Sequence, residues 1–518
     1  MSKAVSTWFA LAMIFSWYSV ANLSQVGAQS VPLQPLNSGS KRIVAKGDQS
    51  SRSQPSTVSH RAWISLDPVT HQISIIDTVL VPAHLDSFNL NSTLQLDESE
   101  ELCETNHGEL TSAVVTFGVH QDSSVQTGCT GFILPAPPGG ISPRSAARML
   151  RLAYHGTFYE SVEEVAFSRE KVGGEIRATI SEEGIYLANS ANWLPNFGND
   201  VLVSHHLIVQ TPLGIEPVTQ GKRTRQEEID GRLITVWAAD LPSDGLNLVA
   251  GRYVVTEEKI GHVTIATYLL GDDKKLSDLY LERTKAYLTM YEEMIGPYPY
   301  GKFATVENWF PTGYGMPSYT LLGGMVLRLP FIPYTSFGHE ICHNWWGNSV
   351  FVDLAEGNWC EGLTVYCADY HYKELESPVA AREYRRNLLK DYAAYVRNGN
   401  DFPLNEFESR HSGATRAVGY GKSMMVFHMV DRMIGREKFL AALRVLGPGG
   451  GQDADAAWRA MRRSPARELV ALSVVAGRGA LLQVRQARIR RSTRVIAALT
   501  RTPRHDNIKT PANNCSRS

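Results

Sequence analysis

The 518-residue sequence has few cysteines, almost no net charge and, beyond its first 28 residues, no long apolar run. Six cysteines are too few for a fold held together by disulfide bonds. The 51 basic and 52 acidic residues argue against a protein built as a whole to coat nucleic acid. No later segment approaches the ~20 apolar residues that a membrane helix needs. With 43% apolar residues, the chain as a whole is not disordered.

The small net charge conceals an uneven distribution. Residues 451–518 hold 13 Arg and one Lys against four acidic residues, a net charge of +10. Residues 1–450 hold 37 basic and 48 acidic residues, a net charge of −11. We therefore predict that residues 447–518 form a separate, basic tail with a single aromatic residue. The tail has three interpretations: a disordered interaction segment, a short helical cap, or the translation of a shifted reading frame.

The first residues have the pattern of an export signal. Lys3 supplies a basic start, residues 8–20 are mostly apolar, and residues 26–28 (Val-Gly-Ala) have small side chains before a cleavage site. An uncleaved membrane anchor is the alternative. We predict that residues 1–28 are a signal peptide and residues 29–58 a linker. The mature protein is then periplasmic or extracellular and not stably inserted in a membrane.

Export also permits disulfide bonds. Cys103 and Cys129 lie in the same region of predicted strands and are therefore a candidate pair. The alternative is that both remain free thiols.

The hydrophobic pattern changes near residue 257. Residues 59–256 contain short apolar or alternating segments separated by Gly and Pro turns, which predicts an all-β domain. Residues 257–446 have mostly helical periodicity, which predicts an α+β domain. The elements expected there are helix 275–296, strand 303–310 and helices 335–348, 361–375, 379–399 and 420–446.

Residues 339–343 read His-Glu-Ile-Cys-His and match the HExxH pattern of zinc hydrolases. On a helix, residues i and i+4 are about one turn apart, so His339 and His343 can reach the same metal ion. Glu340 lies beside them and can take a proton from a water that the metal activates. A helix with solvated surface charges is the alternative.

A catalytic zinc ion usually has three protein ligands and one open position. Glu361 is the preferred third ligand because it begins a predicted helix, which holds a side chain more rigidly than a loop does. Asp353 and Glu356, in the loop before that helix, are the rival candidates.

The motif and its surroundings resemble the zinc metallopeptidase family that contains aminopeptidase N. The resemblance is carried by residues 339–348 (HEICHNWWGN) and 358–370 (NWCEGLTVYCADY), and also by segments 71–82, 184–197 and 248–255. It covers roughly residues 60–446. It implies an N-terminal β-saddle-like domain, a thermolysin-like α+β catalytic domain, and one zinc ion per chain held by His339, His343 and Glu361.

The resemblance implies further site residues. Tyr420, 59 residues after Glu361, matches a family tyrosine that can donate a hydrogen bond to the oxyanion. A structural tyrosine at a helix start is the alternative. A strand that aligns the substrate corresponds to Gly313, Tyr314, Gly315 and Met316.

Two features depart from the family pattern. The interval between His343 and Glu361 is 17 residues, where the family has 18. Pro317 stands where exopeptidases of the family carry the glutamate that binds the α-amine of the substrate. Glu307 is nearby in sequence and is a candidate replacement, although a structural role fits it equally well.

These observations predict a zinc-dependent peptide hydrolase, aminopeptidase-like, with its exopeptidase specificity open. Peptides are the expected substrates, no nucleic acid is expected as a partner, and the oligomeric state is not predicted. The alternatives are a non-catalytic or lid-less family member that binds ligands, and a zinc hydrolase of a non-peptide substrate. Family members usually continue into a helical C-terminal domain, whereas this pattern stops near residue 446, which implies an atypical or truncated C-terminal segment.

Overall fold

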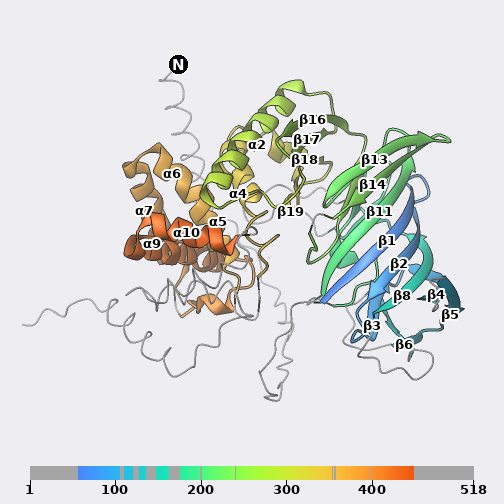
Figure 1. Cartoon of the computed structure of the whole chain (residues 1–518). Helices are drawn as coiled ribbons and strands as arrows, with labels where there is room; N and C mark the ends of the chain where they lie inside the picture. Colours follow the sequence, from blue (N-terminus) through green and yellow to red (C-terminus); the bar gives the residue numbers. More distant parts are fainter. Residues whose placement is uncertain are drawn as a thin grey trace, which may run out of the picture.

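The computed structural model describes residues 56–104, 110–120, 128–135, 147–162, 176–198, 201–239, 241–352, 354, 357–397 and 399–447. The predicted signal peptide, most of the predicted linker and nearly all of the basic tail lie outside these residues, as do Asp353 and Glu356. A large β-rich part is followed along the chain by a part with most of the helices (Figure 1).

The β-rich part is built around an eight-stranded sheet with the order β13-β14-β11-β1-β2-β8-β4-β5. Its strands are β1 (Ser56–Asp67), β2 (Gln72–Val81), β4 (Leu94–Glu104), β5 (Leu110–Val114), β8 (Arg148–Thr157), β11 (Val201–Pro212), β13 (Lys222–Ile229) and β14 (Arg232–Ala238). Strands β1 and β11 are parallel, and the other neighbours are antiparallel. Alternate residues of β2, from Ile73 to Val81, are buried because one face of the sheet packs on the core.

Two smaller sheets complete this part, with the orders β12-β15-β10-β9 and β3-β7-β6. Their strands are β3 (Ser87–Asn91), β6 (Gly118–His120), β7 (Cys129–Ile133), β9 (Ala178–Ile180), β10 (Ile185–Leu187), β12 (Glu216–Thr219) and β15 (Leu248–Gly251). Cys129 is a free thiol whose Sγ accepts a hydrogen bond from the Asn192 amide. The candidate disulfide between Cys103 and Cys129 is therefore not formed.

A five-stranded sheet with the order β16-β17-β18-β20-β19 begins the second part. Its strands are β16 (Val254–Ile260), β17 (Val263–Leu269), β18 (Lys302–Asn308), β19 (Gly313–Met316) and β20 (Tyr319–Gly323). Strand β18, predicted as 303–310, lies between β17 and β20 and is buried throughout. Helix α2 (Lys274–Met294), predicted as 275–296, packs against β17. The Asp273 side chain caps α2 by accepting a hydrogen bond from the Leu276 amide.

The remaining predicted helices are present, but their ends and continuity differ. The helix predicted at 335–348 is shorter: α4 spans Ser336–Cys342, and the chain turns through Gly347, where φ is +103°. The helix predicted at 420–446 is divided at Gly435, where φ is +90°. The helical segments not yet given are α3 (Gly324–Leu327), α5 (Cys360–Val365), α6 (His371–Glu376), α7 (Pro378–Tyr395), α8 (Gly413–Arg416), α9 (Ser423–Ile434), α10 (Arg436–Leu446), the 3₁₀ turns η1 (Asn189–Ala191), η2 (Ile332–Tyr334) and η5 (Leu404–Glu406), and the π-helical segments η4 (Tyr366–Tyr370) and η6 (Ala417–Lys422).

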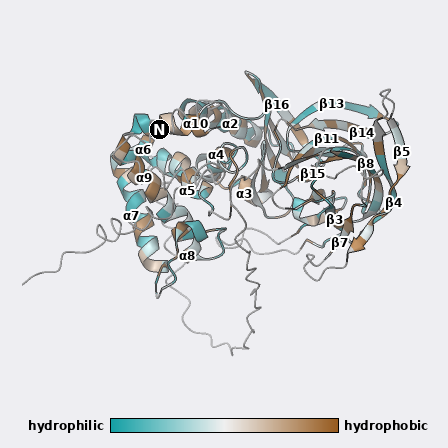
Figure 2. Ribbon diagram, turned by 60° about the horizontal axis from the view of Figure 1, so that its bottom comes forward, coloured by the Kyte–Doolittle hydropathy of each residue, from teal (hydrophilic) through white to brown (hydrophobic). Residues whose placement is uncertain are grey.

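The five-stranded sheet joins the two parts. Val306 and Leu321 belong to the same hydrophobic core as the β-rich part, whereas Ile265 and Phe303 pack with the helices in a second core. Helices α7 and α9 each carry both hydrophobic and hydrophilic residues (Figure 2). Among the described residues, no helix has the length and apolar character needed to span a membrane.

Candidate metal centre

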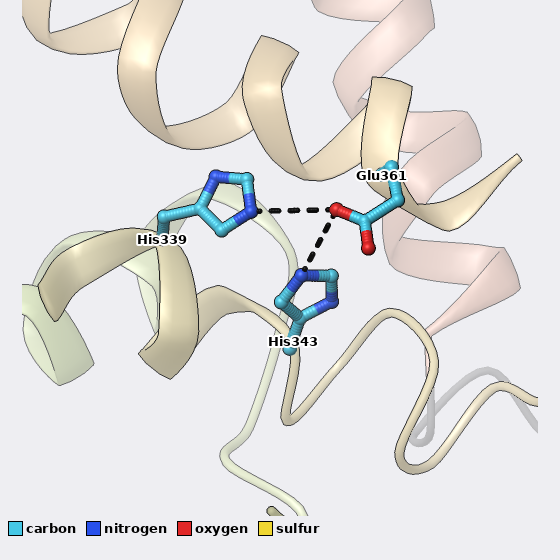
Figure 3. Close-up of side chains that lie close together, drawn as sticks. All are labelled: His339, His343 and Glu361. Carbon is cyan, nitrogen blue, oxygen red and sulfur yellow. Dashed lines mark ion pairs between the residues drawn. The ribbon is translucent and has the colours of Figure 1, made fainter. Parts of the chain in front are cut away.

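Three of the predicted site residues converge. His339 lies in α4, His343 directly follows the last residue of α4, and Glu361 lies in the first turn of α5. Each histidine Nε2 atom lies 3.5 Å from Oε2 of Glu361 (Figure 3). One ligand atom from each residue lies within 4.8 Å of the other two. The structure therefore brings together side chains that are 22 residues apart, from His339 to Glu361, around a space of the size that a metal ion needs.

Helix α4 is held in place by tyrosine and tryptophan side chains. The Tyr291 hydroxyl donates a hydrogen bond of 2.8 Å to the carbonyl of Gly338, and a side chain at position 338 would collide with Tyr372. Trp345, just after the helix, is fully buried and donates to the carbonyl of Gly296. These contacts fix the direction of α4 and hence of its two histidines.

Each histidine is oriented by a second group. Nδ1 of His339 lies 2.6 Å from Oδ2 of Asp369, and Nδ1 of His343 lies 3.0 Å from the carbonyl oxygen of Trp346. Since a carbonyl can only accept, His343 carries its proton on Nδ1 when neutral. The lone pair on Nε2 is then available for a metal. The same tautomer of His339 would donate to Asp369. Sequence reasoning missed Asp369, which lies in the π-helical segment η4.

The charges in this cluster favour a cation. Burial opposes charging of His339, but the Asp369 carboxylate raises the pKa of His339 to about 10. Burial also opposes charging of His343, yet Glu361 raises the pKa of His343 well above its ordinary value. The pKa of Glu361 is lowered despite burial, because the two imidazoles lie beside it. The two carboxylates therefore stabilise positive charge at the space between the ligand atoms.

The donor set fits zinc. Two imidazole nitrogens and one carboxylate oxygen form a set found in catalytic zinc sites, where the fourth position stays open. The buried Oε2 atom of Glu361 has no hydrogen-bond partner among the described residues. An unsatisfied buried carboxylate oxygen is costly, and a bound cation would satisfy it.

Glu340 lies against the edge strand of the five-stranded sheet. Burial, more than any other effect, raises the pKa of the Glu340 carboxyl. A Cβ atom on Gly315 of β19 would lie only 2.5 Å from Oε2 of Glu340. The strand can pass this close to the carboxylate because residue 315 has no side chain.

Tyr420, in the π-helical segment η6, lies beside the cluster. Its ring is nearly parallel to that of His339, with centroids 6.4 Å apart, and meets the Phe407 ring edge-on. Burial first, and then the charge of Glu361, raise the pKa of the Tyr420 phenol. The phenol therefore stays protonated and can donate a hydrogen bond.

Strand β19 contains all four residues predicted to align the substrate. It is the edge of its sheet and pairs only with β20 among the described strands. Tyr314 is 41% exposed, whereas Met316 is buried in the core, so Met316 can offer a substrate only its main chain. The following Pro317 is buried too.

Glu307 does not provide a free carboxylate in place of Pro317. It is buried, with Oε1 lying 2.5 Å from an Arg328 guanidinium nitrogen. Its Oε2 accepts a hydrogen bond of 2.9 Å from the Leu270 amide. Both oxygens are thus engaged within the fold, which favours the structural role for Glu307.

No family model and no curated protein sequence matches this chain. Solved structures do match. An M1 zinc metallopeptidase from Deinococcus radiodurans is 16% identical, with a TM-score of 0.57, and the match covers 83% of this chain and 95% of that one. A mutant of the enzyme bound to a Tyr-Ser-Ala substrate matches over the same shares, with 16% identity and a TM-score of 0.54. A two-domain M1 zinc metallopeptidase mutant bound to L-arginine also has 16% identity, the same coverage and a TM-score of 0.57. At this identity the likeness shows the fold: the chain shares the two-part architecture of these M1 zinc metallopeptidases.

Proposed function

We propose that this protein is a zinc-dependent peptide hydrolase of the M1 type. The observation that carries the proposal is the convergence of His339, His343 and Glu361, with Glu340 beside them against an edge strand. The fold supports it, because proteins with this architecture include an M1 metallopeptidase bound to a tripeptide substrate.

Each catalytic group has a distinct role in the proposed mechanism. When bound, one zinc ion would polarise the scissile carbonyl and make a water molecule easier to deprotonate. Glu340 accepts the proton of the attacking water and delivers it to the leaving amine. Burial raises the pKa of Glu340, which makes its carboxylate a stronger base for the first step. Tyr420 donates a hydrogen bond to the developing oxyanion.

Strand β19 offers a way to align the substrate. Its outer edge can pair with an extended peptide through main-chain hydrogen bonds. The absence of a free carboxylate at Pro317 and Glu307 removes two means of selecting an N-terminal ammonium group. We therefore propose that the chemistry is aminopeptidase-like but that residues 307 and 317 do not select substrates with a free N-terminus.

A combined metal and peptide assay tests the proposal. The full chain should bind one zinc ion and cleave peptides, and Glu340→Gln should keep the zinc but lose about 10²- to 10⁴-fold in kcat. A panel of peptides with free and blocked N-termini separates exopeptidase from endopeptidase activity. Cleavage by Glu340→Gln at the wild-type rate would refute the assigned base.

The same assay separates the alternatives. A purified chain without zinc affinity would support a non-catalytic binding protein. A zinc-loaded chain that cleaves no peptide would support a hydrolase of a non-peptide substrate.

We also propose export of the mature protein, because residues 1–28 have the pattern of a signal peptide. Mass spectrometry of the protein produced in its native host tests this directly. A mature N-terminus after Ala28 is expected, and a retained Met1 would contradict cleavage.

A further inference from the structure

Arg410, near the candidate metal centre, has no acidic partner among the described residues. The Arg410 guanidinium carbon lies 6.0 Å from the centroid of the Tyr420 ring. No carboxylate pairs with Arg410 in the part of the chain that the structure describes. Two basic side chains farther along the chain do have acidic partners: Arg416 pairs with Asp391, and Lys422 pairs with Asp401.

The backbone around Arg410 is fixed on both sides. Before it, the carbonyl of Phe407 accepts a hydrogen bond from the amide of Asn358, and the carbonyl of Glu408 accepts one from the Asn358 side chain. After it, the amide of His411 donates to the hydroxyl of Thr415. Asn358 lies two residues before the start of α5, so the segment that carries Arg410 is tied to the chain that leads into the helix of Glu361.

Arg410 is linked to the candidate metal centre through the Tyr420 ring. Its guanidinium carbon lies over that ring, 6.0 Å from the ring centroid. The Tyr420 ring in turn lies 6.4 Å from the ring of His339. The guanidinium therefore lies no farther from the His339 ring than these two distances together, 6.0 and 6.4 Å. An extended peptide of roughly three or four residues covers that span at about 3.3–3.6 Å per residue.

We propose that Arg410 binds the C-terminal carboxylate of short peptide substrates, and that the enzyme thereby prefers peptides whose carboxylate lies only a few residues from the scissile bond. A guanidinium presents paired N–H donors that match a carboxylate. Arg410 is exposed, lies on a segment with a fixed backbone, and has no carboxylate partner among the described residues, so its N–H donors are available to a substrate carboxylate. The proposal rests on peptide hydrolysis, the function proposed above.

The test compares trialanine with its C-terminal amide, both with a free N-terminus. Wild-type enzyme should have the higher kcat/KM on the free acid, and the difference should lie mainly in KM. Arg410→Gln should lower kcat/KM on the free acid by roughly 10- to 100-fold, the range of a hydrogen bond between charged groups, and leave the amide nearly unchanged. Arg410→Lys should keep part of the preference. Arg386→Gln, on the surface of α7 and paired with Glu383, is the matched control and should change neither substrate.

Two outcomes would overturn the proposal. Equal losses on the acid and the amide in Arg410→Gln would mean that Arg410 acts only through Tyr420. Equal activity on both peptides in the wild type would mean that the carboxylate is not recognised.

A binding measurement separates failure of this inference from failure of the proposed function. Calorimetry on zinc-loaded Glu340→Gln measures the affinity for each peptide without turnover. Tighter binding of the free acid, abolished by adding Arg410→Gln, would support the role of Arg410 even if hydrolysis is slow. Binding of neither peptide would contradict both the inference and a peptide substrate.

Discussion

The Nδ1 atom of His339 lies 2.6 Å from Oδ2 of Asp369, which belongs to the same continuous helical stretch as Glu361. One stretch of chain thus supplies both a candidate metal ligand and the carboxylate that orients another ligand. Because the two acidic residues share one helical stretch, movement of that stretch would disturb two of the three ligands together.

Replacement of this carboxylate should weaken the metal site without removing a ligand. In Asp369→Asn, the amide can still accept a hydrogen bond, but the negative charge that favours an electron-rich imidazole is lost. We expect the zinc dissociation constant to rise by about 10- to 100-fold. Competition with a chromophoric chelator measures it. Asp391→Asn, which removes a surface carboxylate paired with Arg416, is the control and should leave zinc affinity unchanged. Equal affinities for wild type and Asp369→Asn would contradict the orienting role.

Removal of the Tyr420 hydroxyl should affect turnover and little else. Tyr420→Phe keeps the ring that packs near His339 and Phe407. We expect kcat to fall by about 10²- to 10³-fold, as for loss of one oxyanion donor. KM and zinc content should stay close to those of the wild type, because the hydroxyl is proposed to act on the transition state. Steady-state kinetics on a peptide substrate provides the measurement, and an unchanged kcat would assign Tyr420 to structure alone.

Sequence spacing was sufficient to find the candidate ligands but not Asp369. The separation of four residues between His339 and His343 corresponds to one helical turn, so a local pattern reveals their common face. Asp369 lies eight residues after Glu361, which on a regular α-helix would put the two about 80° apart around the axis. The π-helical segment η4 adds residues to a turn and changes this angle. Such a local irregularity has no simple signature in the hydrophobic pattern.

Contacts between distant segments set a second limit. The change in hydrophobic periodicity predicted a β-rich part followed by a more helical one, and the structure has this order. The engagement of Glu307 by Arg328 and the free thiol of Cys129 depend instead on how strands and helices pack. The local sequence could not decide the role of Glu307 or the pairing of Cys129, because the residues that contact each of them belong to other elements.

Addition of a single methyl group on β19 should disturb the general base. In Gly315→Ala, the new Cβ would lie 2.5 Å from Oε2 of Glu340, so the carboxylate must move. We expect kcat to fall by about 10²-fold, the cost of a displacement of about 1 Å at a reacting group, while zinc binding is retained. Gly271→Ala is the matched control, since nothing lies within 4 Å of a Cβ there. Wild-type kcat in Gly315→Ala would mean that Glu340 is not held where the strand passes.

Stability at acidic pH should depend on Glu374 of α6, which accepts hydrogen bonds of 2.7 and 2.6 Å from Arg436 at the start of α10. Burial opposes its charge, but hydrogen bonds from His371 and Arg436 lower the pKa of Glu374 to about 2, from an ordinary value of 4.5. A lowered folded-state pKa means that the stabilisation is complete above about 4.5 and is lost as the pH falls towards 2. Glu374→Gln should therefore lower the melting temperature by about 1–3 °C at pH 7, because the pair is partly exposed. The difference from wild type should shrink below pH 4. Glu376→Gln, whose partner Lys373 lies on the same helix, should show a smaller effect at every pH. A difference for Glu374→Gln that stays constant from pH 7 to 3 would show that its charge does not stabilise the contact between α6 and α10.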